Sequence, residues 1–172
     1  MKFRNLVAAA AMAALLVPGV AQANWKTTKW GQSVDDVVKA GKQFKVKRIA
    51  DVEKDRVGNK QRLAVGEVTE GGVKFQVQFY FTPDGKSLQL VRYEPVEKMN
   101  CFDQEKLAVK LYGEGKPHDE VEKIDGGNGQ MFDVNFHMRD WVGDGSDKVG
   151  TLHALIGTET TDVCTWTFEP GN

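Results

Sequence analysis

The 172-residue chain lacks several features that would point to a function. Its 23 Lys and Arg stand against 24 Asp and Glu, which leaves no basic excess of the kind that nucleic-acid binding needs. Its N-terminal apolar run is shorter than the roughly 20 residues that span a bilayer, and no second apolar segment is long enough to cross a membrane. It has no Gly-x-Ser-x-Gly elbow, and its glycine-rich stretch at 126–129 lacks the Lys and Ser or Thr of a phosphate loop. We therefore expect no nucleic-acid partner, no stable membrane insertion and no cofactor.

Cysteine is scarce, with only Cys101 and Cys164 in the sequence. An even count suggests a bridge when the chain resides in an oxidising compartment. Neither cysteine belongs to a Cys-x-x-Cys motif or stands beside a histidine, so a pair of reactive free thiols is the weaker alternative. We predict a Cys101–Cys164 disulfide that fixes the start of a helix to the last strand of a sheet.

The first 23 residues follow the order of a secretory signal peptide. Lys2 and Arg4 precede an apolar run over 6–17, and the small residues of 21–23 suit a cleavage site. No cysteine follows that site, so a lipid anchor there is not expected. We predict a cleaved signal peptide, a mature chain that begins at Asn24, and a bacterial periplasmic or secreted location.

The first part of the mature chain is typical of a helix followed by an antiparallel meander. Ser33 can cap a helix that Gly41 ends, and Asp36 completes a capping-box pattern. In the next segments apolar and polar residues alternate, as they do in strands. The clearest segment, 73–81, has a strict period of two, which predicts one buried and one solvent-facing side. The expected strands are 44–49, 63–68, 73–81 and 88–93.

The same order of elements recurs in the second part of the chain. Asp103 can cap a second helix, which runs to Gly113. An extended segment at 116–124 and strands at 132–138, 152–156 and 163–168 follow. We predict an α+β fold of two tandem repeats, each a helix followed by a three- to four-stranded antiparallel meander. The repeats cover 24–99 and 100–172, packed as one globular unit.

Two short motifs resemble those of small exported bacterial proteins. Residues 30–37 read Trp-Gly-Gln-Ser-Val-Asp-Asp-Val, and residues 111–117 contain Leu-Tyr-Gly followed by Pro. With the repeated helix and meander, they make the chain resemble the tandem-repeat β-lactamase inhibitor protein family and the small outer-membrane assembly lipoproteins of the SmpA/OmlA type. The lipoproteins carry an anchoring cysteine that this chain lacks, and such proteins usually have two helices per repeat. The resemblance implies a fold and a binding style, with no named partner.

The three histidines are the candidates for a catalytic or metal site. His118, His137 and His153 are scattered, but His137 and His153 fall on neighbouring predicted strands. Two ligands without a third make a poor zinc site, so ordinary surface histidines are the favoured interpretation. A small envelope hydrolase with a His-containing site stays the alternative function.

The solvent-facing side of the predicted sheet is the candidate binding surface. If the two meanders form one curved sheet, polar residues of both halves share a concave surface, and Trp141 in a nearby loop can anchor a partner, although it can equally be a core residue. We predict a non-catalytic binding, inhibitory or assembly-support protein of the cell envelope with a protein or peptide partner. A structural or stress-related protein without a tight ligand is a third possibility. The predicted binding residues are Gln76, Gln78, Tyr80, Asn135, His137 and Trp141.

Overall fold

The computed structural model describes residues 25–50, 55–127, 129–142, 147–156 and 159–171. The predicted signal peptide and the predicted mature start at Asn24 lie outside these residues. The elements in chain order are α1 (Val34–Ala40), a 3-10 turn η1 (Lys42–Phe44), β1 (Lys47–Arg48), β2 (Arg56–Val57), β3 (Lys60–Glu70), β4 (Val73–Phe81), β5 (Leu88–Pro95), α2 (Cys101–Tyr112), β6 (Lys116–Asp125), β7 (Met131–Val142), β8 (Asp147–Ile156) and β9 (Glu159–Pro170).

Both helices begin at side-chain caps. The Ser33 hydroxyl accepts from the Asp36 backbone N–H, and the N–H of Gly41 closes α1 on the Val37 carbonyl, as the sequence predicts. In α2 the cap is Asn100, whose side chain accepts from the backbone N–H of Asp103. Asp103 therefore stands inside the first turn, and the predicted cap was three residues late.

The strands form one antiparallel sheet in the order β1-β3-β4-β5-β9-β8-β7-β6, with β2 paired to β3. The last strand, β9, returns to the middle and joins β5 through the pairs Val91–Phe168, Arg92–Thr167 and Tyr93–Trp166. The predicted α+β fold of two helix-and-meander repeats is therefore wrong. The chain is a mostly-β protein with one nine-stranded sheet and, in its described part, two short α-helices.

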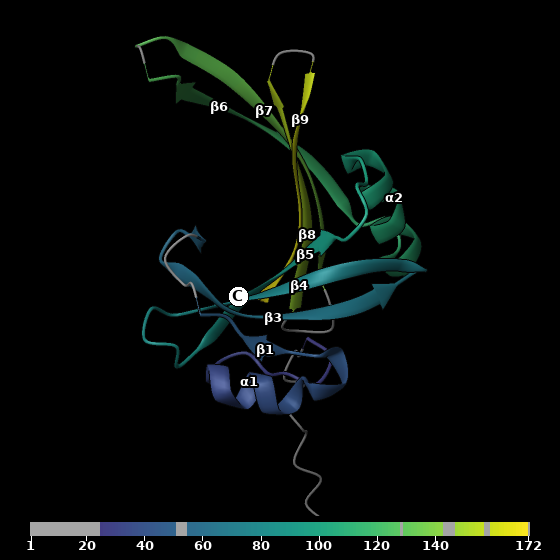
Figure 1. Ribbon diagram of the computed structural model, residues 1–172. Coiled ribbons are helices and arrows are strands. Elements are labelled where there is room, and N and C mark those ends of the chain that lie inside the picture. Colours follow the sequence, from purple (N-terminus) through teal and green to yellow (C-terminus); the bar gives the residue numbers. More distant parts are fainter. Residues whose placement is uncertain (1–24, 51–54, 128, 143–146, 157–158, 172) are drawn as a thin grey trace, which may run out of the picture.

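The sheet is strongly curved, and both helices lie on its convex side (Figure 1). Helix α1 packs on β1 and β3, and α2 packs on β8 and β9. Between them lies one aromatic core in which Trp25, Phe75, Tyr93 and Trp166 are buried. The Trp25 indole N–H donates to the Tyr93 hydroxyl at 2.9 Å, and the Tyr93 and Trp166 ring centroids are 5.3 Å apart. Because this core bridges the β5–β9 join, the halves do not have separate cores.

The disulfide predicted from the sequence is present between Cys101 and Cys164. It ties the first residue of α2 to β9, with the two Cα atoms 5.3 Å apart. Disulfides persist in oxidising compartments, so the bond indicates an extracytoplasmic protein. In the described part of the chain, no helix has the length and apolar character needed to cross a membrane.

Strands β6 and β7 form an arm that extends from the body of the molecule (upper left in Figure 1). Strand β6 is the edge of the sheet, and its side chains are almost all exposed. Pro117 and a run of charged residues line this edge, a composition that discourages pairing with another chain.

Candidate binding surface

Cross-strand pairing fixes which side chains share the concave side of the sheet. Gln78 pairs with Arg92, Arg92 with Thr167, Thr167 with Gly150, and Gly150 with Asp140. Directly paired residues lie on the same face of an antiparallel sheet. We call the side to which these five residues belong the concave face. No helix of the described chain covers it (Figure 1).

The floor of the concave face is a buried polar network around Tyr80. The Tyr80 hydroxyl lies 2.8 Å from Gln78 Oε1 and 3.1 Å from Asp55 Oδ1, and the Arg92 guanidinium stands 5.5 Å from the centre of the Tyr80 ring. Gln78 Nε2 donates to Glu94 at 2.5 Å. Burial, the largest cause, raises the pKa of Tyr80 to about 12. These hydrogen bonds pair the Tyr80 hydroxyl and the Gln78 amide within the network.

Two of the three predicted solvent-facing residues of β4 are therefore buried. Tyr80 has 0% of its surface exposed and Gln78 has 4%, whereas Gln76 is exposed. The prediction of a solvent-facing side fails here because Asp55 and Arg92 reach over β4 and shield it from solvent. Alternation in a single strand cannot reveal cover that comes from its neighbours.

A hollow of about 260 Å³ lies further along the concave face, over β5, β9, β8 and β7. Leu90, Met138 and Leu152 give it apolar walls, and Arg92 and Thr167 give it polar ones. Arg92 Nε is buried and donates no hydrogen bond within the described structure. Apolar walls with a few polar groups are the usual composition of a recognition pocket.

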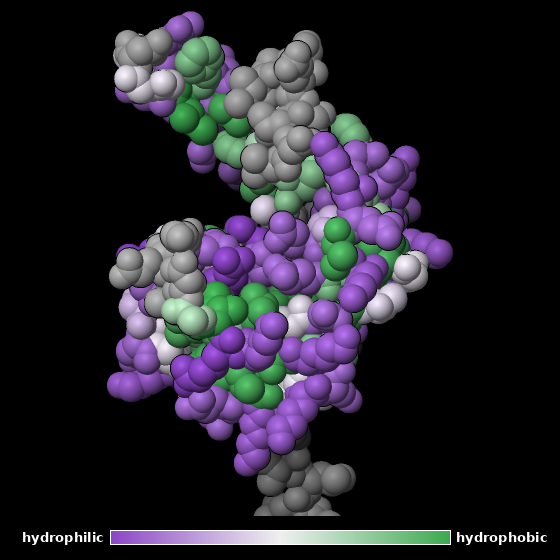
Figure 2. All heavy atoms as spheres, viewed as in Figure 1, coloured by the Kyte–Doolittle hydropathy of each residue, from purple (hydrophilic) through white to green (hydrophobic). Residues whose placement is uncertain are grey.

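The apolar side of β7 turns to the concave face as well. Asp140 is on that face, and β7 pairs without a register shift, so Phe132, Phe136 and Met138 lie on it too. Phe132 is 40% exposed. Figure 2 shows apolar atoms gathered on the side of the arm that faces the body across a notch. An apolar column thus stands on the side of the sheet that no described helix covers.

The other predicted binding residues of β7 lie on the opposite, convex side. Asn135, His137 and Trp141 alternate with the apolar column, so they cannot share a surface with Gln76, and the predicted common surface is split between the two faces. Trp141 is buried at 7% exposure, and its indole N–H donates to the Gly113 carbonyl at 2.7 Å. It packs near Tyr112 at the end of α2 and is not a loop anchor.

His137 and His153 are directly paired on β7 and β8, which confirms that they lie on neighbouring strands, and both lie beneath α2. Glu105 of α2 reaches both, with Oε2 at 3.4 Å from His137 Nε2 and 3.8 Å from His153 Nε2. Arg139 donates to Glu105 Oε1 at 2.5 Å, and Asp119 stands 2.6 Å from His137 Nδ1. Sequence reasoning found the two histidines but missed Glu105, because its partners come from strands more than 30 residues away.

This cluster has the character of a packing site. Burial raises the pKa of Glu105, but the hydrogen bond from Arg139 and the nearby histidines outweigh it, so that the pKa falls below its usual value. Burial lowers the pKa of His153, whose side chain is 1% exposed. Among the described residues, no group of three or more His, Cys, Asp or Glu is arranged to hold a metal. A carboxylate neutralised by Arg139 beside a buried histidine offers a substrate little access, which disfavours a hydrolase here.

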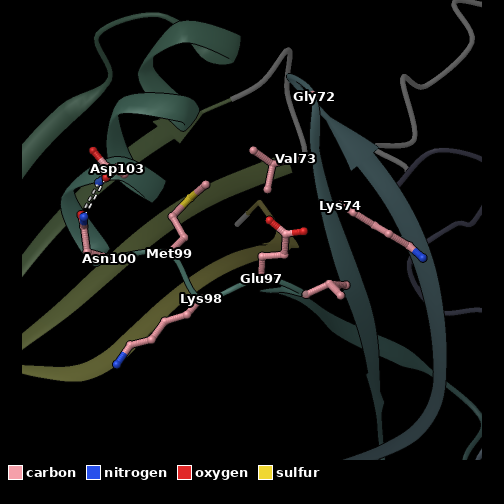
Figure 3. Close-up of a pocket in the computed structure, with 9 residues that line it drawn as sticks. Gly72, Val73, Lys74, Glu97, Lys98, Met99, Asn100 and Asp103 are labelled. Atoms are coloured by element: carbon pink, nitrogen blue, oxygen red, sulfur yellow. Dashed lines mark hydrogen bonds between the residues drawn. The ribbon is translucent and has the colours of Figure 1, made fainter.

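A further hollow, of about 400 Å³, lies between the β3–β4 hairpin and the segment before α2 (Figure 3). Glu97 points toward Val73 across it, whereas Lys74 and Lys98 point away. Its Asn100–Asp103 hydrogen bond belongs to the cap of α2. The groups that face the hollow do not converge, so we place the binding surface on the concave face.

No family model, no curated protein and no solved structure matches this chain. The resemblance to the inhibitor and lipoprotein families therefore stays a prediction, and the tandem-repeat fold that it implied is contradicted by the single sheet.

Proposed function

We propose that this chain is an exported, non-catalytic binding protein of the cell envelope, and that it receives a protein or peptide partner on its concave face. Inhibition of an enzyme and support of an assembly are both forms of such binding. The Cys101–Cys164 disulfide supports the extracytoplasmic location, and the signal-peptide order of the first 23 residues supports export.

One observation carries the proposal, namely that the apolar column of β7 faces the side of the sheet that the described helices leave bare. In an antiparallel sheet with one covered face, the apolar side chains normally turn toward the cover. Here Phe136 turns away from α2, while His137 turns toward it. Exposed apolar patches on soluble proteins commonly mark interaction sites. The adjacent hollow beside Arg92 adds polar groups for specificity.

The experiment places a photo-crosslinking phenylalanine analogue at position 136 or position 135. The two positions are consecutive on β7 and both are part-exposed, but Phe136 is on the concave face and Asn135 is on the convex side. Each protein is incubated with an envelope extract of the source cell, irradiated, and analysed by mass spectrometry.

A discrete adduct from position 136 that position 135 does not give is the expected result. Replacing Leu152, which borders the same face, by Glu should abolish that adduct without lowering the melting temperature of the protein by more than a few degrees. Equal adducts from both positions, or none from position 136, would refute a partner on the concave face.

A further inference from the structure

We infer that the partner contacts the arm through a basic, apolar segment of protein, such as a strand or helix with Lys or Arg beside aliphatic side chains. This inference rests on the proposed function and adds the chemical class of the partner. It comes from the charges that border the apolar column.

The outer end of the concave face is apolar at its centre. Phe132 pairs with Ile124 of β6, and the two side chains are 40% and 44% exposed. Val134 and Phe136 continue the column toward the body. Val134 is already buried at 5% exposure, so the side chains that gain cover from a partner are Phe132, Ile124 and the part-exposed Phe136.

Two carboxylates border this column along the free edge of the sheet. Glu122 pairs with Val134 and Glu120 pairs with Phe136, so both acids lie on the concave face beside apolar neighbours. Both are exposed, and within the described residues neither takes part in an ion pair. A partner that brings Lys or Arg to this edge pairs them while its apolar side chains cover the column.

The negative charge of this edge also argues against two other occupants, a second copy of the chain and an anionic lipid surface. A two-fold contact between copies of the chain brings each patch against itself, so that Glu120 and Glu122 meet acids. The concave side chains of β6 and β7 from His118 outwards contain no Lys or Arg, and Lys148, nearer the body, is already paired with Asp140. An anionic lipid surface is repelled by the same carboxylates.

The test measures binding of the mature chain to a fluorescein-labelled nonapeptide of alternating Leu and Lys by fluorescence anisotropy. The control is a nonapeptide of the same length and opposite charge, with alternating Leu and Glu. Glu122→Lys is compared with Asp133→Lys, which makes the same change in charge at nearly the same height on the arm but on the convex side. Both variants are checked for unchanged thermal unfolding, and Glu122→Gln replaces Glu122→Lys if that variant does not fold.

We expect the Leu–Lys peptide to bind at least about fivefold more tightly than the Leu–Glu peptide, and Glu122→Lys to weaken that binding by about fivefold. Asp133→Lys should change it by less than about twofold, and Glu122→Gln should weaken it by about twofold. The preference should diminish at high salt.

Several results would overturn the inference. These are equal binding of the two peptides, equal effects of Glu122→Lys and Asp133→Lys, concentration-dependent dimerisation that Glu122→Lys strengthens, and sedimentation of the chain with phosphatidylglycerol vesicles. If the adduct from position 136 persists while the charge preference is absent, the basic partner is refuted and the concave binding face stands. If both the adduct and the peptide binding are absent, both proposals are refuted.

Discussion

Replacing Arg139 with Met tests how α2 is held to the sheet. The Arg139 side chain is 18% exposed and donates to Glu105, which is 9% exposed, and also to the Glu114 carbonyl at 2.5 Å. Met keeps much of the aliphatic length but leaves the Glu105 carboxylate in a buried site without its cation. Breaking a buried pair from one side costs about 3–5 kcal/mol, and the residual exposure of Arg139 places the expected loss near the lower end, at about 3 kcal/mol.

The assay is urea unfolding near neutral pH, followed by circular dichroism. The double variant Glu105→Gln/Arg139→Met removes both charges, so it should lose only about 1–2 kcal/mol. The hydrogen bond from Arg139 lowers the pKa of Glu105 below its usual value of 4.5, so the wild-type protein gains stability above that pH and loses it as the pH falls. The gap between wild type and Arg139→Met should therefore narrow on acidification. A single-variant loss below about 1 kcal/mol, the value of an exposed pair, would refute a buried anchor.

Three further predictions concern stability, each measured by urea unfolding. Changing Cys101 and Cys164 to Ser frees a loop with a sequence separation of 63 residues and should cost about 4 kcal/mol; an unchanged midpoint would show that the bond stabilises nothing. Burial lowers the pKa of His153 below its usual value of 6.5, so stability should fall as the pH drops through 6.5, and His153→Phe should flatten the dependence of stability on pH; an identical dependence in the variant would assign the effect to another group. Gly71→Ala should lose about 1–2 kcal/mol, since Gly71 has a φ of +56° and a Cβ there would lie 2.4 Å from Leu107; full stability would mean that the β3–β4 turn relaxes freely.

Local features of the fold could be predicted from the sequence because they depend on neighbouring residues. The period of two predicts β4 to the residue, and Ser33 and Gly41 bound α1 as expected. The disulfide could be predicted from the count of two cysteines together with the predicted export of the chain. Some strand lengths were underestimated, as with β7, which extends four residues beyond the predicted 132–138 at its C-terminal end. The strand predicted at 44–49 was overestimated, because only β1, Lys47–Arg48, is extended there.

Two features could not be predicted, namely the sheet topology and the face of the sheet on which the apolar side chains of β7 lie. Both depend on which strands pair with one another. Alternation indicates that Phe132 and Phe136 share a side, but not which side of the finished sheet they occupy. The pairing of β7 with β8, in which Trp141 lies opposite Val149, determines the face. It places His137 on the side of Glu105, beneath α2. The predicted common surface is divided for the same reason, since Gln76 and Asn135 are each on a polar side of their strand but on opposite faces of the sheet.

The β5–β9 join has a consequence for the order in which the chain matures. Strand β9 comprises Glu159–Pro170, so the central seam of the sheet closes only after the chain has emerged as far as Phe168. Until then β5 presents an unpaired margin, and the Tyr93 side of the aromatic core lacks Trp166. Partly emerged chains are therefore exposed to mispairing at β5 during this interval.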